Sequence, residues 1–80
     1  MRISIIEEKI KEIIPNSTIK VIDTNGTGDH FSVMVISDMF DGLTLINRHK
    51  LIYKALNQFL NNEIHALQIK AITNKEYNNE

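Results

Sequence analysis

Two short alternating segments around a glycine-rich turn constrain the fold of this chain more than any other feature. Residues 18–23 and 30–37 carry apolar side chains at every second position, which predicts two strands with one buried face each. Between them, Asn25-Gly26 is a strong signal for a tight turn, and Gly28 adds a second position that adopts positive φ easily. We therefore expect an antiparallel hairpin with a mobile, glycine-rich tip.

A helical repeat precedes the hairpin. Isoleucines recur on one face at positions 6, 10, 13 and 14, with charged residues on the opposite face. Ser4 and Glu7 have the spacing of a capping box, and Pro15 disfavours helix at the residue before it. A first helix is expected at about residues 4–14.

A second helical repeat follows the hairpin. In the connector, Phe40 is expected to fill the core and Gly42 to form a turn, and Thr44 can then cap the helix. Asn61 and Asn62 are expected to end it, because asparagine tolerates the left-handed conformation of helix ends. The predicted apolar stripe consists of Leu45, His49, Ile52, Leu56, Phe59 and Leu60.

A third strand is expected at about residues 64–72, with His65 in phase with its more apolar side. The helical crossover should bring this strand back parallel to the second one. Thr73 and Glu76 form another capping box, which predicts a short last helix. The expected fold is α+β: a single domain over residues 1–80, α-β-β-α-β-α in order, with helices on one face of a three-stranded mixed sheet.

The bulk composition excludes several classes of protein. The sequence has no cysteine, so any metal here must be bound by histidine, carboxylates or a partner's sulfur. The net charge of −1 argues against a broad nucleic-acid-binding face but leaves room for a local basic patch. No apolar stretch approaches the roughly 20 residues that cross a bilayer. Isoleucines alternate with charged residues near the N-terminus, unlike in a signal peptide. We expect a cytoplasmic protein.

Two histidines are the candidate metal ligands. His30 opens the second predicted strand and His65 opens the third, so parallel pairing would place both at the same end of the sheet. Two imidazoles could bind a borderline metal, but they form an incomplete site that a partner would have to complete. The alternative is that both histidines are structural. No catalytic triad or buried carboxylate pair can be assembled, and we expect no enzyme activity.

The second predicted helix carries a basic cluster of Arg48, His49, Lys50 and Lys54. Arg48 and Lys50 are expected to face water, with His49 at the edge of the apolar stripe. One interpretation is a solvated face with a packed histidine. The other is a docking surface for an acidic partner, a nucleic acid or a thiol cofactor.

Four segments in order resemble the BolA family. The family pattern is similar to HF-x-V, V/I-S-x-x-F-x-G, R-H-R/K and a final IHAL, and its terminal T-P-E-E-W resembles residues 73–77. The matching segments are Asp29-His30-Phe31-Ser32-Val33, Ser37-Asp38-Met39-Phe40-Asp41-Gly42, Asn47-Arg48-His49-Lys50-Leu51-Ile52 and Ile64-His65-Ala66-Leu67. Together they cover nearly the whole chain.

The resemblance implies a fold related to the class II KH domain and partnership with a monothiol glutaredoxin. In such pairs a [2Fe–2S] cluster is shared: glutaredoxin and glutathione each supply a thiolate, and the IHAL histidine, here His65, is a ligand. No cofactor is then expected in the isolated protein, which would be a monomer or weak homodimer. The Gly-x-x-Gly clamp of RNA-binding KH domains is absent, which argues against direct RNA binding.

The hairpin loop departs from the pattern of many family members, which carry a second Cys or His ligand there. This chain has Thr27, whose hydroxyl is a poor ligand for iron–sulfur chemistry, and the short loop resembles the IbaG-type branch. Either His30 is the second ligand, or His65 alone contacts the cluster from this side.

The resemblance also implies an alternative function. Some family members act in stress responses as transcriptional regulators that contact DNA through the region of the Arg-His-Lys segment. Arg48, Lys50 and Lys54 would make those contacts here, and with this net charge the binding would be weak and salt-sensitive.

Overall fold

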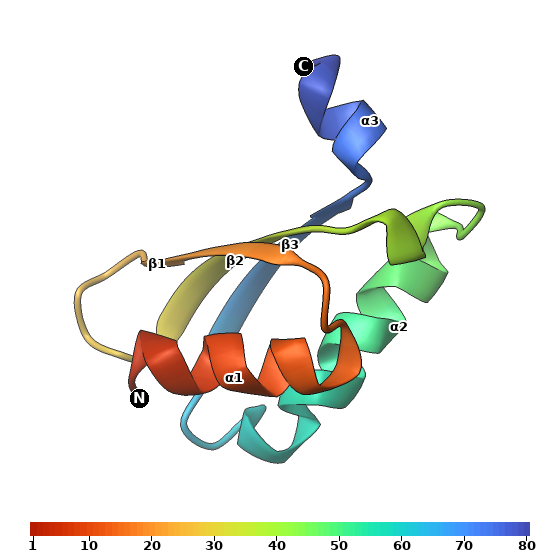
Figure 1. Cartoon of the computed structure of the whole chain (residues 1–80). Helices are drawn as coiled ribbons and strands as arrows, with labels where there is room; N and C mark the ends of the chain where they lie inside the picture. Colours follow the sequence, from red (N-terminus) through yellow and green to blue (C-terminus); the bar gives the residue numbers. More distant parts are fainter.

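A computed structural model describes residues 1–80. The elements follow in the predicted order α-β-β-α-β-α, with two short 3₁₀ turns, η1 and η2, on either side of the second helix (Figure 1). Their bounds are α1 Ile3–Ile13, β1 Thr18–Asp23, β2 His30–Ile36, η1 Asp38–Phe40, α2 Leu45–Leu56, η2 Asn57–Phe59, β3 Ala66–Ile72 and α3 Asn74–Asn78.

The three strands form one mixed sheet in the order β1-β2-β3. β1 and β2 pair antiparallel as the predicted hairpin, and β3 lies parallel to β2 with Ala66 opposite His30. β3 begins two residues later than expected. Ile64 forms an isolated bridge with Leu60, which the left-handed turn at Asn61 (φ 63°) makes possible. The turn before β3 therefore holds Ile64 away from the sheet ladder.

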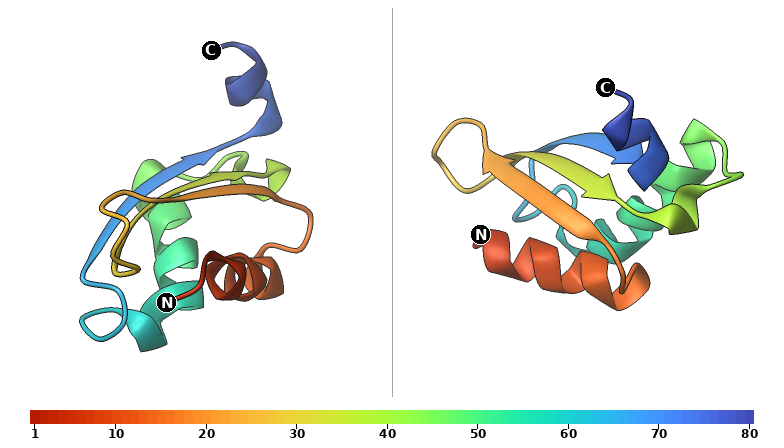
Figure 2. Two further views of the ribbon diagram at one scale, coloured as in Figure 1. Left: turned by 90° about the vertical axis from the view of Figure 1, so that its left-hand side faces the viewer. Right: turned by 45° about the horizontal axis from the view of Figure 1, so that its top comes forward.

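The core lies between the sheet and the two longer helices. Figures 1 and 2 show α1 and α2 together beneath one face of the sheet. α3 lies on the opposite side, where Tyr77 and Glu80 contact Lys20 and Lys70 of the outer face. The expected placement of helices on one face therefore holds for α1 and α2 only. The fully buried core residues are Ile6, Ile10, Ile14, Phe31, Val33, Val35, Phe40, Ile52, Leu56, Ile64 and Ala71.

The starts of α2 and α3 agree with prediction, but the start of α1 and the end of α2, expected at Asn61 and Asn62, do not. Thr44 accepts a hydrogen bond from Asn47 N at the start of α2, and Thr73 and Glu76 form the predicted capping box of α3. α1 begins one residue earlier than expected. Its N-cap residue is Arg2, with no side-chain cap, so the predicted capping box of Ser4 is wrong. None of the helices is long and apolar enough to span a membrane.

The buried side of α2 differs from the predicted stripe. Ile52 and Leu56 are buried as expected, but Leu45 is 64% exposed, and the α-helix ends at Leu56. The first turn of α2 extends past the apolar core, so Leu45 has no core to pack against. The inward side of α2 instead includes Arg48, which bears directly on the basic cluster described below.

Candidate functional site

Parallel pairing of β2 and β3 brings His30 and His65 together. His30 is the first residue of β2, and His65 directly precedes its pairing partner Ala66. The two ring centroids are 6.3 Å apart, with the ring planes nearly perpendicular at 86°. The prediction that both histidines lie at one end of the sheet is confirmed. We refer to them as the imidazole pair.

Asp29 connects the two members of the imidazole pair. Its Oδ1 lies 2.8 Å from His30 Nδ1, and its Oδ2 lies 3.2 Å from His65 Nδ1. The backbone reinforces this arrangement, because the amide of His65 donates a hydrogen bond to the Asp29 carbonyl at 2.7 Å. One residue therefore positions both the strand end and the two rings.

The hairpin loop holds Asp29 in place. Gly28 has φ of +76°, a conformation that L side chains rarely adopt, and its amide donates to Asp23 Oδ2 at 2.8 Å. The Thr27 hydroxyl hydrogen-bonds Asp29 Oδ1. The loop was expected to have a mobile tip, and these bonds fix its end at the imidazole pair.

The Asp29 carboxylate is strongly stabilised in its charged form. The hydrogen bond from Thr27 is the largest cause and the bond with His30 the next, and together with the charges of the imidazoles they lower its pKa from 3.8 to about 2. Hydrogen bonds to a carboxylate favour ionisation because they stabilise the anion. Asp29 is therefore an anion at neutral pH, and it faces two imidazoles.

The site is open on the surface. The side chain of His65 is 58% exposed and that of His30 is 36% exposed. Both rings are therefore accessible from the surface.

The ligands that this chain offers suit a metal centre shared with a partner better than one bound by this chain alone. Imidazole nitrogen is a suitable donor for iron and other borderline metals. No group of three or more His, Cys, Asp or Glu side chains is arranged to hold a metal ion, however. The imidazole pair by itself would supply two ligands of a coordination shell.

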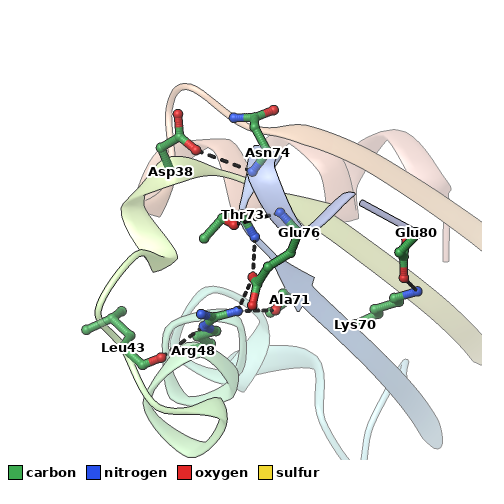
Figure 3. Close-up of polar contacts among 9 residues, drawn as sticks. All are labelled: Asp38, Leu43, Arg48, Lys70, Ala71, Thr73, Asn74, Glu76 and Glu80. Carbon is green, nitrogen blue, oxygen red and sulfur yellow. Dashed lines mark hydrogen bonds and ion pairs between the residues drawn. The ribbon is translucent and has the colours of Figure 1, made fainter. Parts of the chain in front are cut away.

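The basic cluster of α2 does not form a single surface. Arg48 was expected to face water, but its side chain is only 13% exposed, so that prediction is wrong. Its guanidinium donates to Leu43 O at 3.0 Å, to Ala71 O at 3.2 Å and to Glu76 at 2.6 Å (Figure 3). With Thr73, whose amide also bonds Glu76, these residues form the Arg48 network, which joins α2 to the end of β3 and to α3.

The remaining basic residues of the cluster lie as predicted. Lys50 and Lys54 are exposed, and His49 is half-buried. Besides Leu45, two other large side chains of α2, Ile46 and Tyr53, are exposed, at 69% and 42%. The chain has no acidic residue between positions 42 and 62, so this outer face of α2 carries no negative charge of its own.

Comparison with known proteins places the chain in a family. The family model for BolA-like proteins matches residues 3–76, which is nearly the whole chain. The chain belongs to the BolA family. The structure agrees: a crystal structure of a Bol-like protein from Babesia bovis superposes with a TM-score of 0.85 at 28% identity, covering 99% of this chain and 92% of that one.

Relatives in the BolA family carry different descriptions. An uncharacterised protein of Rickettsia prowazekii is 40% identical, over 85% of this chain and 88% of its own length. The Escherichia coli DNA-binding transcriptional regulator BolA is 34% identical (90% and 75% covered), and the E. coli acid stress protein IbaG is 30% identical (86% and 84%). The expected assignment to the IbaG-type branch is not singled out by these similarities; only membership of the BolA family is.

Sequence reasoning found the imidazole pair but missed Asp29. The carboxylate was considered only as part of the turn and of a family segment. The available signal was its position: an acidic residue directly before the first histidine of a strand, preceded by a glycine that can turn the chain. Its ion-pair contact with His65 spans 36 residues in sequence, and only the strand register reveals it.

Proposed function

We propose that this BolA-family protein is a non-enzymatic partner of a monothiol glutaredoxin, with which it co-ligates a bridged [2Fe–2S] cluster in iron–sulfur cluster trafficking or in iron, redox or stress sensing. The observation that supports the proposal most strongly is the imidazole pair at one open end of the sheet. The site exposes nitrogen ligands but lacks the thiolates that a cluster also needs.

The imidazole pair suits this role. [2Fe–2S] clusters are usually held by four cysteine thiolates, and imidazoles replace two of them in Rieske centres, which raises the reduction potential. In the proposed complex, the glutaredoxin cysteine and glutathione would supply the thiolates. His65 is the first ligand, because its exposed side chain is the one most open to a partner.

His30 is the proposed second ligand from this chain. It lies beside His65 and is itself partly exposed. Thr27, which occupies the loop position where many family members carry a Cys or His, instead directs its hydroxyl to Asp29. This geometry supports His30 over Thr27.

The test is an anaerobic titration of a [2Fe–2S]-loaded monothiol glutaredoxin with this protein, followed by visible circular dichroism. A saturable spectral change at equal stoichiometry is expected for the wild type. His65→Ala should abolish it, and His30→Ala should weaken or alter it. His49→Ala is the matched control, because His49 lies on α2 outside the site. Urea unfolding of each variant reports whether it is folded.

Three outcomes decide the proposal. No spectral change with the wild type would overturn the partnership. An unaltered change with His65→Ala would show that the protein binds glutaredoxin without ligating the cluster. A change lost on His65→Ala and retained on His49→Ala supports ligation at the imidazole pair.

A second candidate function is DNA binding by the outer face of α2. Lys50 and Lys54 are exposed there without acidic neighbours on the helix, and one relative is described as a DNA-binding transcriptional regulator. Arg48 cannot make such contacts without leaving the Arg48 network. Any DNA binding would therefore depend on the two lysines and the exposed apolar residues beside them.

Salt-dependent binding to duplex DNA tests this candidate. If Lys50 and Lys54 contact phosphates, the plot of the logarithm of the association constant against the logarithm of the salt concentration should be less steep for Lys50→Gln/Lys54→Gln. The magnitude of its slope should fall by about 2, since each phosphate contact contributes about 1. Lys9→Gln/Lys75→Gln removes the same charge elsewhere and is the control. Equal slopes for the two double variants would exclude α2 as the DNA-binding element.

A further inference from the structure

The carboxylate of Asp29 contacts the same ring atom, Nδ1, of both histidines. We propose that Asp29 is a positioning residue: it holds His30 and His65 in the Nδ1–H tautomer and so presents the Nε2 atom of each ring as the free ligand atom. The tautomer assignment stands on the geometry alone. The use of these Nε2 atoms by a metal rests on the proposed function.

Hydrogen-bonding chemistry fixes the tautomers. An ionised carboxylate can only accept hydrogen bonds, so each nitrogen that contacts it must carry a proton. Nδ1 of His30 lies 2.8 Å from the carboxylate and forms a hydrogen bond with it. Nδ1 of His65 lies 3.2 Å from the other carboxylate oxygen in an ion-pair contact, where a lone pair on Nδ1 would be repelled by the anion. A neutral imidazole has one N–H and one lone pair, so the lone pair must then lie on Nε2.

Asp29 uses its two carboxylate oxygens separately. Oδ1 accepts hydrogen bonds from His30 Nδ1 and from the Thr27 hydroxyl, whereas Oδ2 lies 3.2 Å from His65 Nδ1. Its carbonyl accepts hydrogen bonds from the amides of His65 and Ala66. The carboxylate is thus fixed by the loop on one side and by the start of β3 on the other, and the two rings are oriented from one anchor.

This arrangement corresponds to the carboxylate and histidine of a carboxylate–histidine–metal triad. Metal-binding histidines commonly donate their second ring N–H to a carboxylate, which sets the tautomer, orients the ring and raises the basicity of the ligating nitrogen. Here one carboxylate would perform this task for two rings. An isolated imidazole in water favours the opposite tautomer, with the proton on Nε2, so loss of Asp29 should be visible in the protein without any metal.

The primary experiment is long-range ¹H–¹⁵N NMR on the isolated, ¹⁵N-labelled protein at about pH 8, where unperturbed imidazoles are neutral. The wild type should show His30 and His65 as Nδ1–H tautomers. Asp29→Ala should shift both toward Nε2–H. Asp41→Asn removes an equal charge at a solvent-exposed carboxylate outside the site and should leave both rings unchanged. Signals of His49 serve as an internal reference, and urea unfolding checks that Asp29→Ala is folded.

Wild-type rings in the Nε2–H form, or tautomers unaltered by Asp29→Ala, would overturn the proposal. Asp29→Asn gives a second variant of similar size. Its amide has one acceptor oxygen in place of two, so at most one of the two rings should keep the wild-type tautomer.

The glutaredoxin titration then tests the consequence for metal ligation. Loss of such a supporting carboxylate typically lowers metal affinity about 10–100-fold, so Asp29→Ala should raise the Kd of the cluster-dependent titration by this factor, with the Asp41→Asn variant unaffected. Equal affinity of Asp29→Ala and wild type would show that the carboxylate does not support the ligands. If the wild type itself gives no spectral change, the proposed function fails, while the NMR result still decides the tautomers.

Discussion

The two ends of β3 are built in opposite ways. At its start, the rings of His65 and the neighbouring His30 are partly exposed and contact each other and one carboxylate. At its end, the Arg48 network satisfies its own polar groups within the chain, and Thr73 is buried. The comparison shows how one strand can serve two purposes. The end that is closed by internal hydrogen bonds stabilises the fold, and the end that is left open is available to a partner.

The difference follows from where the polar atoms are placed. The Arg48 side chain is only 13% exposed, so its hydrogen bonds to the Leu43 and Ala71 carbonyls replace much of its own hydration. The side chain of His65 is 58% exposed, so water can hydrate the ring nitrogen that Asp29 does not contact. Removing a group should therefore affect stability at the first site and binding at the second.

The largest expected effect is on folding stability when Arg48 is lost. Arg48→Ala leaves two carbonyls and the Glu76 carboxylate without their partner, which should lower the free energy of unfolding by about 2 kcal/mol or more. His65→Ala should change it by no more than about 0.5 kcal/mol. Urea unfolding followed by far-ultraviolet circular dichroism measures both.

Arg48→Lys sharpens the first comparison. Lysine keeps the charge but cannot reproduce the fork of donors that reaches Leu43, Ala71 and Glu76 together, so an intermediate loss is expected. Equal stability of the Arg48→Ala and His65→Ala variants would contradict the claim that the Arg48 end of β3 stabilises the fold more than the His65 end.

The next effect concerns the cap of α3. Thr73 is buried, and its hydroxyl accepts from Glu76 N, so Thr73→Ala should lower the free energy of unfolding by about 1 kcal/mol. Thr24→Ala is a matched change near the other end of the sheet, where the hydroxyl is exposed and donates to His30 O. We expect it to cost less than half as much. Thermal or urea unfolding of the pair would refute the contrast if the Thr24 variant were the less stable.

Sequence patterns predicted the parts of this structure that depend on neighbours in the chain. Alternation and the Asn25-Gly26 turn were enough for the hairpin, and the helical crossover was enough to place β3 parallel to β2. Because His30 begins β2 and His65 directly precedes β3, their meeting followed from the topology. Local features failed at the cap of α1, where Ser4 had the right spacing but the helix begins before it, and at the end of α2, which comes at Leu56.

The features that were missed depend on partners distant in sequence. Arg48 turns inward because its hydrogen-bond acceptors come from the connector before α2, the end of β3 and α3. No local sequence pattern predicts that these three segments meet at Arg48. Asp29 reaches His65 only through the register of two strands. In both cases the role of a charged side chain depends on contacts with residues that are distant in sequence and close only in the folded chain.

The smallest expected effect is a change in the pH dependence of stability on replacing Glu76. Hydrogen bonds from Thr73 N and Arg48 lower the pKa of Glu76 below its ordinary value. A carboxyl group whose pKa is lower in the folded state stabilises the fold at pH values above its unfolded pKa, and this contribution is lost as the pH falls through the folded pKa. Wild-type stability should therefore decline on acidification below about pH 5, and part of that decline should be absent in Glu76→Gln.

Urea midpoints measured between about pH 7 and pH 3, across the ordinary carboxyl range, separate this contribution from the others. Asp29 is present in both proteins, so its own lowered pKa contributes the same acid dependence to each and cancels in the difference. Glu63→Gln, at an exposed position outside the Arg48 network, should run parallel to the wild type. Glu76 is itself about half exposed, so solvent screening keeps the effect small.

If the Glu76→Gln curve were also parallel to the wild type, the ion pair with Arg48 would add nothing at this end of β3. The stability of that end would then come from the hydrogen bonds of Arg48 to the Leu43 and Ala71 carbonyls, and its contrast with the imidazole pair would be one of burial rather than of ion pairing.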